Sequence, residues 1–464
     1  MNVKNTLRQK TVEQILNLAS TLSTQNLIRA VQLAEKTVIT HPEMKRMANI
    51  LKESLEKETP ALTLARDVLK RLSPTARKKL IEVFFINAAI ISRQKHKEIW
   101  EKEKLRLPWF FVISPTARCN LHCVGCYAAE YSHKDDLPFE EIDRILQEAK
   151  ELGIYFITVS GGEPFIRPDL LELYEKHNDM YFLVYTNGTF IDEEMAKRLS
   201  ELGNVAPGIS VEGFKKETDQ RRGEGVYEKV LAAMDNLKKA GAVFGFSATP
   251  TRINSDVIMS DEFLDFYIDR GCAFGWYFQY IPIGRNPDVS LMATPEQRNR
   301  LRERLVEIRE TKPIFIGDFW NDGPVVGGCI AGARPNGYFH INSQGDVEPC
   351  VFFQFSVDNI KGKKLIDVLQ SDFFKAIQEA EPYSENKNLM APCAIIDNPE
   401  ILREIVQKYN AKPSYPEVEN LIKNKEVIEF LDNYSKEFKK ITNPIWDKEL
   451  SKKHKCWKDN LENY

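Results

Sequence analysis

Residues 109–127 read Trp-Phe-Phe-Val-Ile-Ser-Pro-Thr-Ala-Arg-Cys-Asn-Leu-His-Cys-Val-Gly-Cys-Tyr, a β-rich run followed closely by three cysteines. Cys119, Cys123 and Cys126 are close enough in sequence for one short loop to point all three sulfurs at a single metal cluster. Three thiolates on a four-iron cube leave one iron open for another ligand. Zinc, with His122 as a fourth ligand, is the alternative, but this spacing after a strand is not usual for zinc fingers. The loop therefore predicts a [4Fe-4S] cluster.

Downstream of this loop, short β-rich runs alternate with amphipathic helical patterns. Six strands, each followed by a helix-sized segment, predict a parallel sheet with right-handed crossovers. Six units are too few to close an eight-stranded barrel, so we expect an α/β fold with an open, partial (β/α)6 barrel and with its chemistry at the C-terminal strand ends. The expected strands are 109–114, 155–160, 181–186, 205–211, 243–249 and 274–281, and the expected helices lie near 139–152, 168–178, 191–202, 226–240 and 260–271.

Several of these strands end in residues suited to ligand binding. Gly161-Gly162-Glu163 ends the second strand, and Thr186-Asn187-Gly188 ends the third. Glycine lets the backbone approach a ligand closely, and a carboxylate pairs with an ammonium group. Ordinary turn chemistry is the alternative for the positions at later strands. Those positions are Ser210, Glu212, Asn254 and Ile283.

The cysteine loop and these strand ends together resemble the radical S-adenosylmethionine (SAM) superfamily, over roughly residues 108–285. The resemblance implies that Cys119, Cys123 and Cys126 hold the cluster, whose open iron binds the amino and carboxylate groups of SAM. It further implies that one electron breaks the sulfonium bond and that the resulting 5′-deoxyadenosyl radical abstracts hydrogen from an unactivated C–H bond. It assigns Gly161, Gly162 and Glu163 to the SAM amino group, Thr186 and Asn187 to a supporting turn, Ser210 and Glu212 to the ribose, Asn254 to the SAM carboxylate or ribose, and Ile283 to adenine.

A charged loop, Thr218–Gly223, follows the fourth expected strand. Several radical SAM enzymes have an Asp…Arg-Gly stretch at this place. The resemblance gives Arg222 two possible partners, the SAM carboxylate and Glu212. A surface salt bridge is the alternative.

A second set of cysteines lies towards the C-terminus. Residues 338–350 read as a β-hairpin, which would bring Cys350 back towards Cys329. The spacing from Cys329 through a glycine to Cys350 resembles the start of a SPASM domain, the auxiliary-cluster extension of many radical SAM enzymes. The full domain adds four clustered cysteines, whereas this chain offers only Cys393 and the remote Cys456.

The chain therefore resembles the shortened Twitch version, with one auxiliary [4Fe-4S] cluster. The resemblance gives Cys329, Cys350 and Cys393 as its ligands. The fourth ligand stays open between Cys456, a non-cysteine side chain and a site for substrate. We expect Cys272 to be a buried apolar residue.

Charge is distributed unevenly along the chain. Residues 1–108 contain 21 Lys and Arg against 11 Asp and Glu, whereas the rest contains 43 against 56. Apolar residues at helical spacing predict helices through this segment, starting with Val12 and Ile15. Its apolar run Val83–Ile91 is either a core helix or a face on lipid or a substrate entrance. The expected domains are a basic helical domain (1–105), the barrel (106–290), the auxiliary-cluster domain (291–400) and a helical tail (401–464).

Neither a membrane-spanning run nor a secretory signal is visible, so we expect a cytoplasmic protein, with peripheral membrane contact through the basic helices. No nucleic-acid partner is expected, and the cluster chemistry calls for a low-potential electron donor of the flavodoxin or ferredoxin kind. The basic helices, the apolar run and the aromatic sixth strand favour a lipid or other apolar small molecule as substrate. The alternatives are a peptide or protein substrate, as for many SPASM enzymes, and a non-enzymatic electron carrier.

Overall fold

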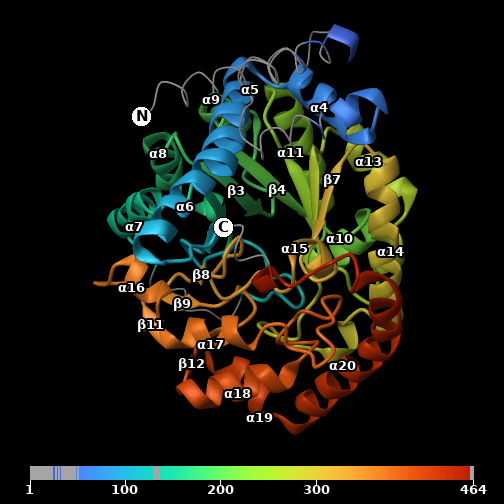
Figure 1. Ribbon diagram of the computed structural model, residues 1–464. Helices are drawn as coiled ribbons and strands as arrows, with labels where there is room; N and C mark the ends of the chain where they lie inside the picture. Colours follow the sequence, from blue (N-terminus) through green and yellow to red (C-terminus); the bar gives the residue numbers. More distant parts are fainter. Residues whose placement is uncertain are drawn as a thin grey trace.

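The computed structural model describes residues 24–26, 29, 32, 49, 52–128 and 136–459. At its centre lies a ten-stranded sheet in the order β11-β9-β8-β1-β2-β3-β4-β5-β6-β7 (Figure 1). Every neighbouring pair from β1 to β7 is parallel, which confirms the expected open α/β barrel. The strands are β1 Phe110–Ile113, β2 Phe156–Val159, β3 Tyr181–Thr186, β4 Val205–Val211, β5 Gly245–Ala248, β6 Phe274–Tyr277, β7 Phe315–Asp318, β8 His340–Ile341, β9 Asp346–Glu348, β10 Phe355–Ser356, β11 Asp358–Asn359 and β12 Lys412–Pro413.

The sheet continues on both sides of the six expected strands. β7 was not expected, because the predicted barrel ended at residue 290 and β7 lies beyond helix α14 Pro295–Thr311, in the segment assigned to the auxiliary-cluster domain. On the other side, the expected hairpin forms as β8 and β9, and β8 pairs in parallel with β1, placing His340 opposite Val112. The auxiliary region is therefore joined to the barrel sheet at β1, the strand that leads into the first cysteine loop.

Helices cover the outer face of the sheet, and strand residues alternate between this face and the barrel interior. Phe246 and Tyr277 pack outward in the helix–sheet core, whereas Phe274 and Trp276 belong to the cluster on the inner face. The covering helices are α7 Phe139–Glu151, α8 Asp169–Lys176, α9 Glu193–Leu202, α10 Lys215–Arg222, α11 Val226–Ala240, α12 Ser255–Ile258, α13 Asp261–Asp269 and α14 Pro295–Thr311, with short turns η2 Pro164–Ile166 and η3 Val289–Leu291.

The N-terminal helices cap the N-terminal ends of the strands, opposite the cysteine loop (Figure 1). Arg71 Nη2 donates to the carbonyl of Gly271, just before β6, at 2.7 Å, and Ser73 N donates to the carbonyl of Gly241, before β5. A helix begins at Pro74, and the Ser73 hydroxyl caps it by accepting from Ala76 N. It runs through α5 Pro74–Lys79, the π-helical η1 Leu80–Ile91 and α6 Ser92–Glu103, preceded by α4 Pro60–Arg71.

The apolar run Val83–Ile91 packs as a core element. Val83 and Ala88 are buried, and the Phe84 ring lies 5.5 Å from that of Phe156 and 5.2 Å from that of Tyr181. The run therefore fills the N-terminal end of the barrel interior. Among the helices that the structure describes, none has the length and apolar character needed to cross a bilayer. The expected helix at Val12 and Ile15 lies outside the described residues.

The C-terminal part lies at the other end of the barrel and is mostly helical, as expected for the tail (Figure 1). A small β10–β12 ladder joins its segments. The domain limits expected from sequence remain predictions. The elements are α15 Gly323–Val326, α16 Leu365–Leu369, α17 Asp372–Ala380, α18 Pro399–Tyr409, η4 Pro416–Glu419, α19 Asn420–Lys423, α20 Lys425–Ile445 and η5 Trp446–Leu450.

Candidate active site and auxiliary cluster site

The first cysteine loop leaves β1 and places three thiols close together. Burial, with smaller effects of the nearby Glu163, Cys123 and Cys126, raises the pKa of Cys119 to about 11. Burial and Cys123 likewise raise the pKa of Cys126. Thiolates crowded in this way repel one another, so a cationic iron cluster would stabilise them together. This donor set fits an iron–sulfur cluster.

The two glycines after β2 let that strand's loop pack directly on the cysteine loop. A Cβ on Gly161 would lie 2.4 Å from the carbonyl oxygen of Thr116, and one on Gly162 would lie 2.1 Å from that of Arg118. Gly162 N donates to the Thr116 carbonyl at 2.9 Å. The Gly-Gly pair is therefore required by the fold itself, and its contact with SAM stays a prediction.

Glu163 connects the ends of β2 and β3. Its buried carboxylate accepts hydrogen bonds from Phe165 N at 3.1 Å, Thr186 Oγ1 at 2.8 Å and Asn187 N at 2.7 Å. Burial raises the pKa of Glu163, and these three donors partly offset that rise. A carboxylate has about four acceptor positions, so only one remains for the predicted SAM ammonium group.

Asn187 carries this network on to the cysteine loop. Its Nδ2 donates to Asn120 Oδ1 at 2.8 Å and approaches Cys119 Sγ at 3.8 Å. A hydrogen-bond donor near a ligating sulfur is one of the features that set a cluster's potential. The structure thus brings Glu163, Thr186 and Asn187 together beside the first cysteine.

Glu212 is the centre of a second buried group, at the end of β4. Its Oε1 receives Arg221 Nη1 at 2.5 Å and Arg222 Nη2 at 2.5 Å, so Arg222 takes Glu212 as its partner. Asn254 Nδ2 donates to the Glu212 carbonyl at 2.9 Å. Val124 N, on the cysteine loop, donates to the Arg221 carbonyl at 2.9 Å. Two arginines therefore lie beside the thiols, where positive charge favours thiolates.

Ser210 and Ile283 occupy different positions around the same loop. Ser210 Oγ lies 3.4 Å from Ser247 Oγ on the inner face of the sheet and is partly exposed. Ile283 is buried, and its neighbour Gly284 packs so closely that a Cβ there would lie 2.1 Å from the Cys126 carbonyl oxygen. Ser210 therefore lies at the ends of β4 and β5, and Ile283 lies next to the cysteine loop.

Sequence reasoning missed a tether between the C-terminal part and the cysteine loop. Gln354 Nε2 donates to the carbonyl of Tyr127 at 3.2 Å, and Tyr415 Oη donates to Gln354 Oε1 at 2.5 Å. Gly284 N in turn donates to Tyr415 Oη at 2.9 Å. The Tyr127 hydroxyl also lies 2.6 Å from Ser160 Oγ. Gln354 and Tyr415 belong to no recognisable motif, so only the folded chain shows their role.

The second cysteine set gathers around the β8–β9 hairpin. Gly332 N donates to the Pro349 carbonyl at 2.9 Å, which holds the segment after Cys329 against the one before Cys350. Burial raises the pKa of Cys329, and Glu381, Cys393 and Cys350 raise it further. Burial also raises the pKa of Cys393 to about 12. The three thiols therefore lie in one buried region, as a shared cluster requires.

Backbone N–H groups point at the sulfurs of this set. Phe352 N donates to Cys350 Sγ at 3.3 Å, and Ile395 N donates to Cys393 Sγ at 3.3 Å. Such contacts stabilise thiolates and clusters. Within residues 52–128 and 136–459 no three His, Cys, Asp or Glu side chains converge on a single metal ion. A four-iron cube does not need such convergence, because each thiolate binds a different iron.

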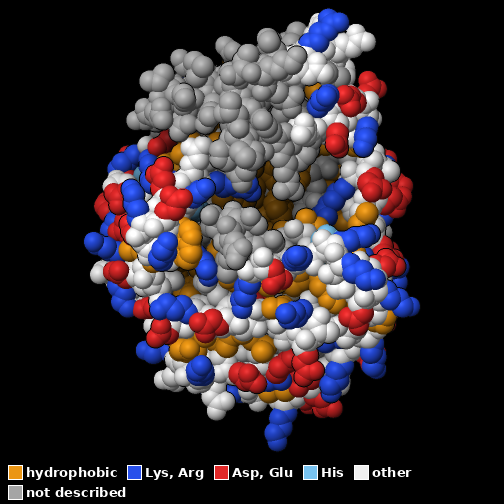
Figure 2. Space-filling view, viewed as in Figure 1, with side chains coloured by type: hydrophobic (Ala, Val, Ile, Leu, Met, Phe, Trp, Pro, Cys, Tyr) orange, Lys and Arg blue, Asp and Glu red, His pale blue; other side chains and the backbone are white. Residues whose placement is uncertain are grey.

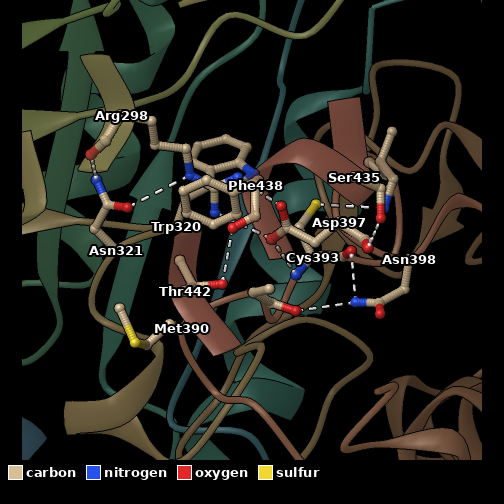
Figure 3. A network of polar contacts seen from close by, with 12 residues as sticks. Arg298, Trp320, Asn321, Met390, Cys393, Asp397, Asn398, Ser435, Phe438 and Thr442 are labelled. Atoms are coloured by element: carbon tan, nitrogen blue, oxygen red, sulfur yellow. Dashed lines mark hydrogen bonds and ion pairs between the residues drawn. The ribbon is translucent and has the colours of Figure 1, made fainter. Parts of the chain in front are cut away.

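A buried ion pair between Arg298 and Asp397 lies beside the backbone of Cys393 (Figure 3). Arg298 Nη1 and Nη2 lie 2.5 and 3.0 Å from the two carboxylate oxygens of Asp397, and Cys393 N donates to Asp397 Oδ2 at 3.0 Å. The Arg298 guanidinium also lies 3.8 Å from the Phe438 ring centroid, and Ser435 Oγ donates to the Asp397 carbonyl. Helix α20, which carries Ser435 and Phe438, thus packs next to the backbone of Cys393.

The two remaining cysteines lie in apolar surroundings. Cys272 is buried in the helix–sheet core, as expected, and burial raises its pKa. Cys456 belongs to a separate apolar cluster with Leu389, Met390, Trp446 and Trp457.

Two family profiles match segments of the chain that contain the two cysteine sets. The family profile for the Radical SAM superfamily matches residues 113–253, and that for the iron–sulfur cluster-binding domain called SPASM matches residues 329–395. Streptococcus suis SuiB bound to S-adenosylmethionine superimposes with a TM-score of 0.51 at 19% identity, covering 64% of this chain and 78% of SuiB. That likeness shows a shared fold.

Among curated relatives, Fe-coproporphyrin III synthase of Methanosarcina barkeri is 32% identical over 228 residues, covering 46% of this chain and 56% of the relative. AdoMet-dependent heme synthase of the same organism is 25% identical over 297 residues, covering 57% and 83%. Mycofactocin maturase MftC of Mycobacterium tuberculosis is 31% identical over 250 residues, covering 51% and 63%. The chain thus spans little more than half of the first relative's length.

The order of β strands, the crowded thiols after β1 and the second thiol set on the hairpin agree with both family profiles. This chain therefore contains a radical SAM segment at residues 113–253 and a SPASM iron–sulfur segment at residues 329–395, which imply a SAM-binding [4Fe-4S] cluster and auxiliary iron–sulfur chemistry.

Proposed function

We propose that Cys119, Cys123 and Cys126 hold the SAM-binding cluster, and that Cys329, Cys350 and Cys393 hold the auxiliary one. When bound, the first cluster and SAM supply a 5′-deoxyadenosyl radical for hydrogen abstraction. SAM would lie along the C-terminal ends of β2 to β5, between the Glu163 and Glu212 networks. A low-potential flavodoxin or ferredoxin would supply the electron.

Within that site the chain's own residues have two kinds of role. The direct SAM contacts that we propose are Gly161, Gly162, Ser210 and Ile283, together with the one acceptor position that Glu163 keeps free for the SAM ammonium group. The residues with the second role make most of their hydrogen bonds among themselves and to the backbone. They are Glu163, Thr186, Asn187, Glu212, Arg222 and Asn254. Their main contribution would be to fix the strand ends, which keeps the ligand-binding backbone in one conformation.

The substrate class follows from the inner face of the sheet, where aromatic rings lie across glycines of neighbouring strands. A Cβ on Gly208 would be 2.9 Å from the Tyr185 ring, and one on Gly317 would be 2.2 Å from the Trp276 ring. Trp276 stacks on Phe278 with ring centroids 6.4 Å apart. Tyr185, Trp276 and Phe278 are all partly exposed. They form an aromatic floor at the barrel interior.

A flat apolar ring system is the ligand best suited to this floor, because aromatic groups stack face to face or edge to face over a large area. Figure 2 shows a hollow with apolar side chains over β3, β4 and β7. Relatives of this chain are named Fe-coproporphyrin III synthase and heme synthase. We therefore propose a tetrapyrrole as substrate, with hydrogen abstraction from one of its side chains. The aromatic floor is the observation that carries this proposal.

A peptide substrate is the second candidate. A solved relative fold is titled as SuiB bound to precursor peptide SuiA, and MftC is named a maturase. A lipid substrate has less support, because the relatives' names point elsewhere and the apolar run Val83–Ile91 packs into the core.

Anaerobic titration of the reconstituted full-length enzyme with Fe-coproporphyrin III and with heme distinguishes these classes. The proposal predicts saturable binding with a shifted Soret band, and binding at least about tenfold weaker in Trp276→Ala, the loss expected for one stacked aromatic ring. Phe85→Ala, which removes an exposed ring on η1, is the matched control and should bind normally. Equal binding by both variants and the parent would exclude the aromatic floor, and no binding to the parent would favour the peptide class.

A further inference from the structure

One buried carboxylate near the auxiliary site, that of Glu381, has an oxygen without a well-formed hydrogen bond among the described residues. Glu381 is 4% exposed. Its Oε2 accepts from Trp457 Nε1 at 2.5 Å and lies 3.8 Å from Arg334 Nε. Its Oε1 is buried and, among the described residues, makes no hydrogen bond of normal geometry, although the Cys329 backbone N–H lies close to this carboxylate. An under-satisfied buried polar atom is costly, so native proteins rarely keep one without a purpose.

The free oxygen faces the backbone next to a predicted cluster ligand. A Cβ on Gly328 would lie 2.3 Å from Glu381 Oε1, and Gly328 has a φ of +122°. Glycine at this position therefore allows the carboxylate to approach directly beside Cys329.

Asp397, another buried carboxylate near these cysteines, is engaged elsewhere. Asp397 gives both oxygens to Arg298, and Oδ2 also accepts from Cys393 N (Figure 3). Cys456 lies in an apolar cluster that does not include Cys350 or Cys393. Its neighbour Trp457 donates its backbone N–H to the Gly327 carbonyl at 2.9 Å. The backbone of Trp457 therefore lies beside Gly327 and Gly328, and the Trp457 indole donates a hydrogen bond to Glu381.

We propose that Glu381 Oε1 is the fourth ligand of the auxiliary cluster, beside Cys329, Cys350 and Cys393, and that Trp457 orients it through Oε2. The inference rests on the cysteine ligands proposed above. A carboxylate oxygen is an acceptable iron ligand, although a harder one than a thiolate. With four protein ligands this cluster has no open iron, so its role is to exchange electrons and not to bind substrate.

The test isolates the auxiliary cluster in full-length protein that carries Cys119→Ala, Cys123→Ala and Cys126→Ala. Iron content, the EPR spectrum after reduction and the reduction potential are measured in this parent and in four further variants. Circular dichroism melting of each apo-protein shows that it folds. We expect Cys350→Ala to lose the cluster, Glu381→Gln to lose iron or change the EPR spectrum, Glu381→Cys to restore the iron content with a new spectrum, and Cys456→Ala to match the parent.

The outcomes distinguish failure of the cysteine ligand set from failure of Glu381 as the fourth ligand. A Cys350→Ala variant with an unchanged cluster would refute the cysteine ligand set. If Cys350→Ala fails to bind iron while Glu381→Gln keeps the parent spectrum and potential, the cysteine set holds and Glu381 is not a ligand. The inference is also overturned if folded Glu381→Gln and Glu381→Cys both lose the cluster, or if Cys456→Ala alone loses it.

Discussion

Arg298 and Asp397 form a fully buried ion pair, with Nη1 2.5 Å from Oδ1 and Nη2 3.0 Å from Oδ2, directly under the backbone of Cys393. The pair joins α14 to the segment before α18, and both side chains are completely buried. Burial alone would disfavour the Arg298 charge, but Asp397 outweighs it and raises the Arg298 pKa. The pair therefore couples the stability of the C-terminal part to the geometry of a predicted cluster ligand.

Arg298→Met should destabilise the apo-protein by about 3–5 kcal/mol, because it leaves Asp397 charged and buried without a partner. The shift in the urea unfolding midpoint, followed by circular dichroism, measures this. Arg300→Met, on the same helix, removes an exposed ion pair with Asp256 and should change stability by at most about 1 kcal/mol. Equal midpoints for the two variants would show that the buried pair does not hold the C-terminal part.

Glu163→Gln should weaken SAM binding by about 1.5–3 kcal/mol, the usual value for a charged hydrogen bond. The amide N–H₂ group would also oppose one of the three donors that now converge on the carboxylate. Isothermal titration with SAM measures the loss. Glu172→Gln, on the exposed side of α8, is the control that should leave the dissociation constant unchanged. A normal constant for Glu163→Gln would remove this carboxylate from the site.

Asp318 predicts a pH dependence of stability. Burial, with Asp322 adding to it, raises the pKa of Asp318 to about 6 in the folded chain, against about 3.9 when unfolded. A raised carboxyl pKa favours the folded state below the unfolded value, and this stability is lost as pH rises through 6. The difference amounts to about 3 kcal/mol.

Melting curves from pH 4 to pH 7 test this dependence. Relative to Asp318→Asn, the parent should lose stability as the pH rises across this window. Exposed Asp256→Asn serves as the control and should run parallel to the parent. Parallel curves for the parent and Asp318→Asn would contradict the prediction.

Cys350→Ala should separate SAM cleavage from product formation. The first cysteine loop is untouched, so reductive release of 5′-deoxyadenosine should continue in the absence of substrate. Product formation should stop, because the auxiliary cluster would be lost. Unimpaired product formation by a soluble, folded Cys350→Ala enzyme would show that this cysteine has neither a redox nor a structural role.

Much of the fold and site could be predicted because the deciding features are local in sequence. The cysteine spacing after β1 and the glycine pair after β2 are contiguous motifs. The six predicted strands are visible in the sequence as short apolar runs at regular intervals. β7 was not expected, because it lies beyond residue 290, where the predicted barrel ended. Helices in the N-terminal segment were predicted, but the π-helical register at Leu80–Ile91 was not.

The long-range pairings could not be predicted. Arg298 and Asp397 are 99 residues apart, and Gln354 and Tyr415 are 61 apart. Glu381 lies in an irregular segment with no spacing that relates it to Cys329. Such side-chain pairs form only because tertiary packing brings distant segments together, and a single sequence contains no periodic pattern that indicates them. Glu163 also shows the limit of motif reasoning, since most of its acceptor capacity serves the chain itself.

The central claim is that the Cys119, Cys123 and Cys126 loop performs the SAM chemistry, and one experiment tests it most directly. Anaerobically reconstituted enzyme should contain about eight iron atoms in two cubes and release 5′-deoxyadenosine with a chemical reductant. The variant with all three cysteines changed to Ala should contain about four iron atoms and release none. Release of 5′-deoxyadenosine by that triple variant would contradict the account.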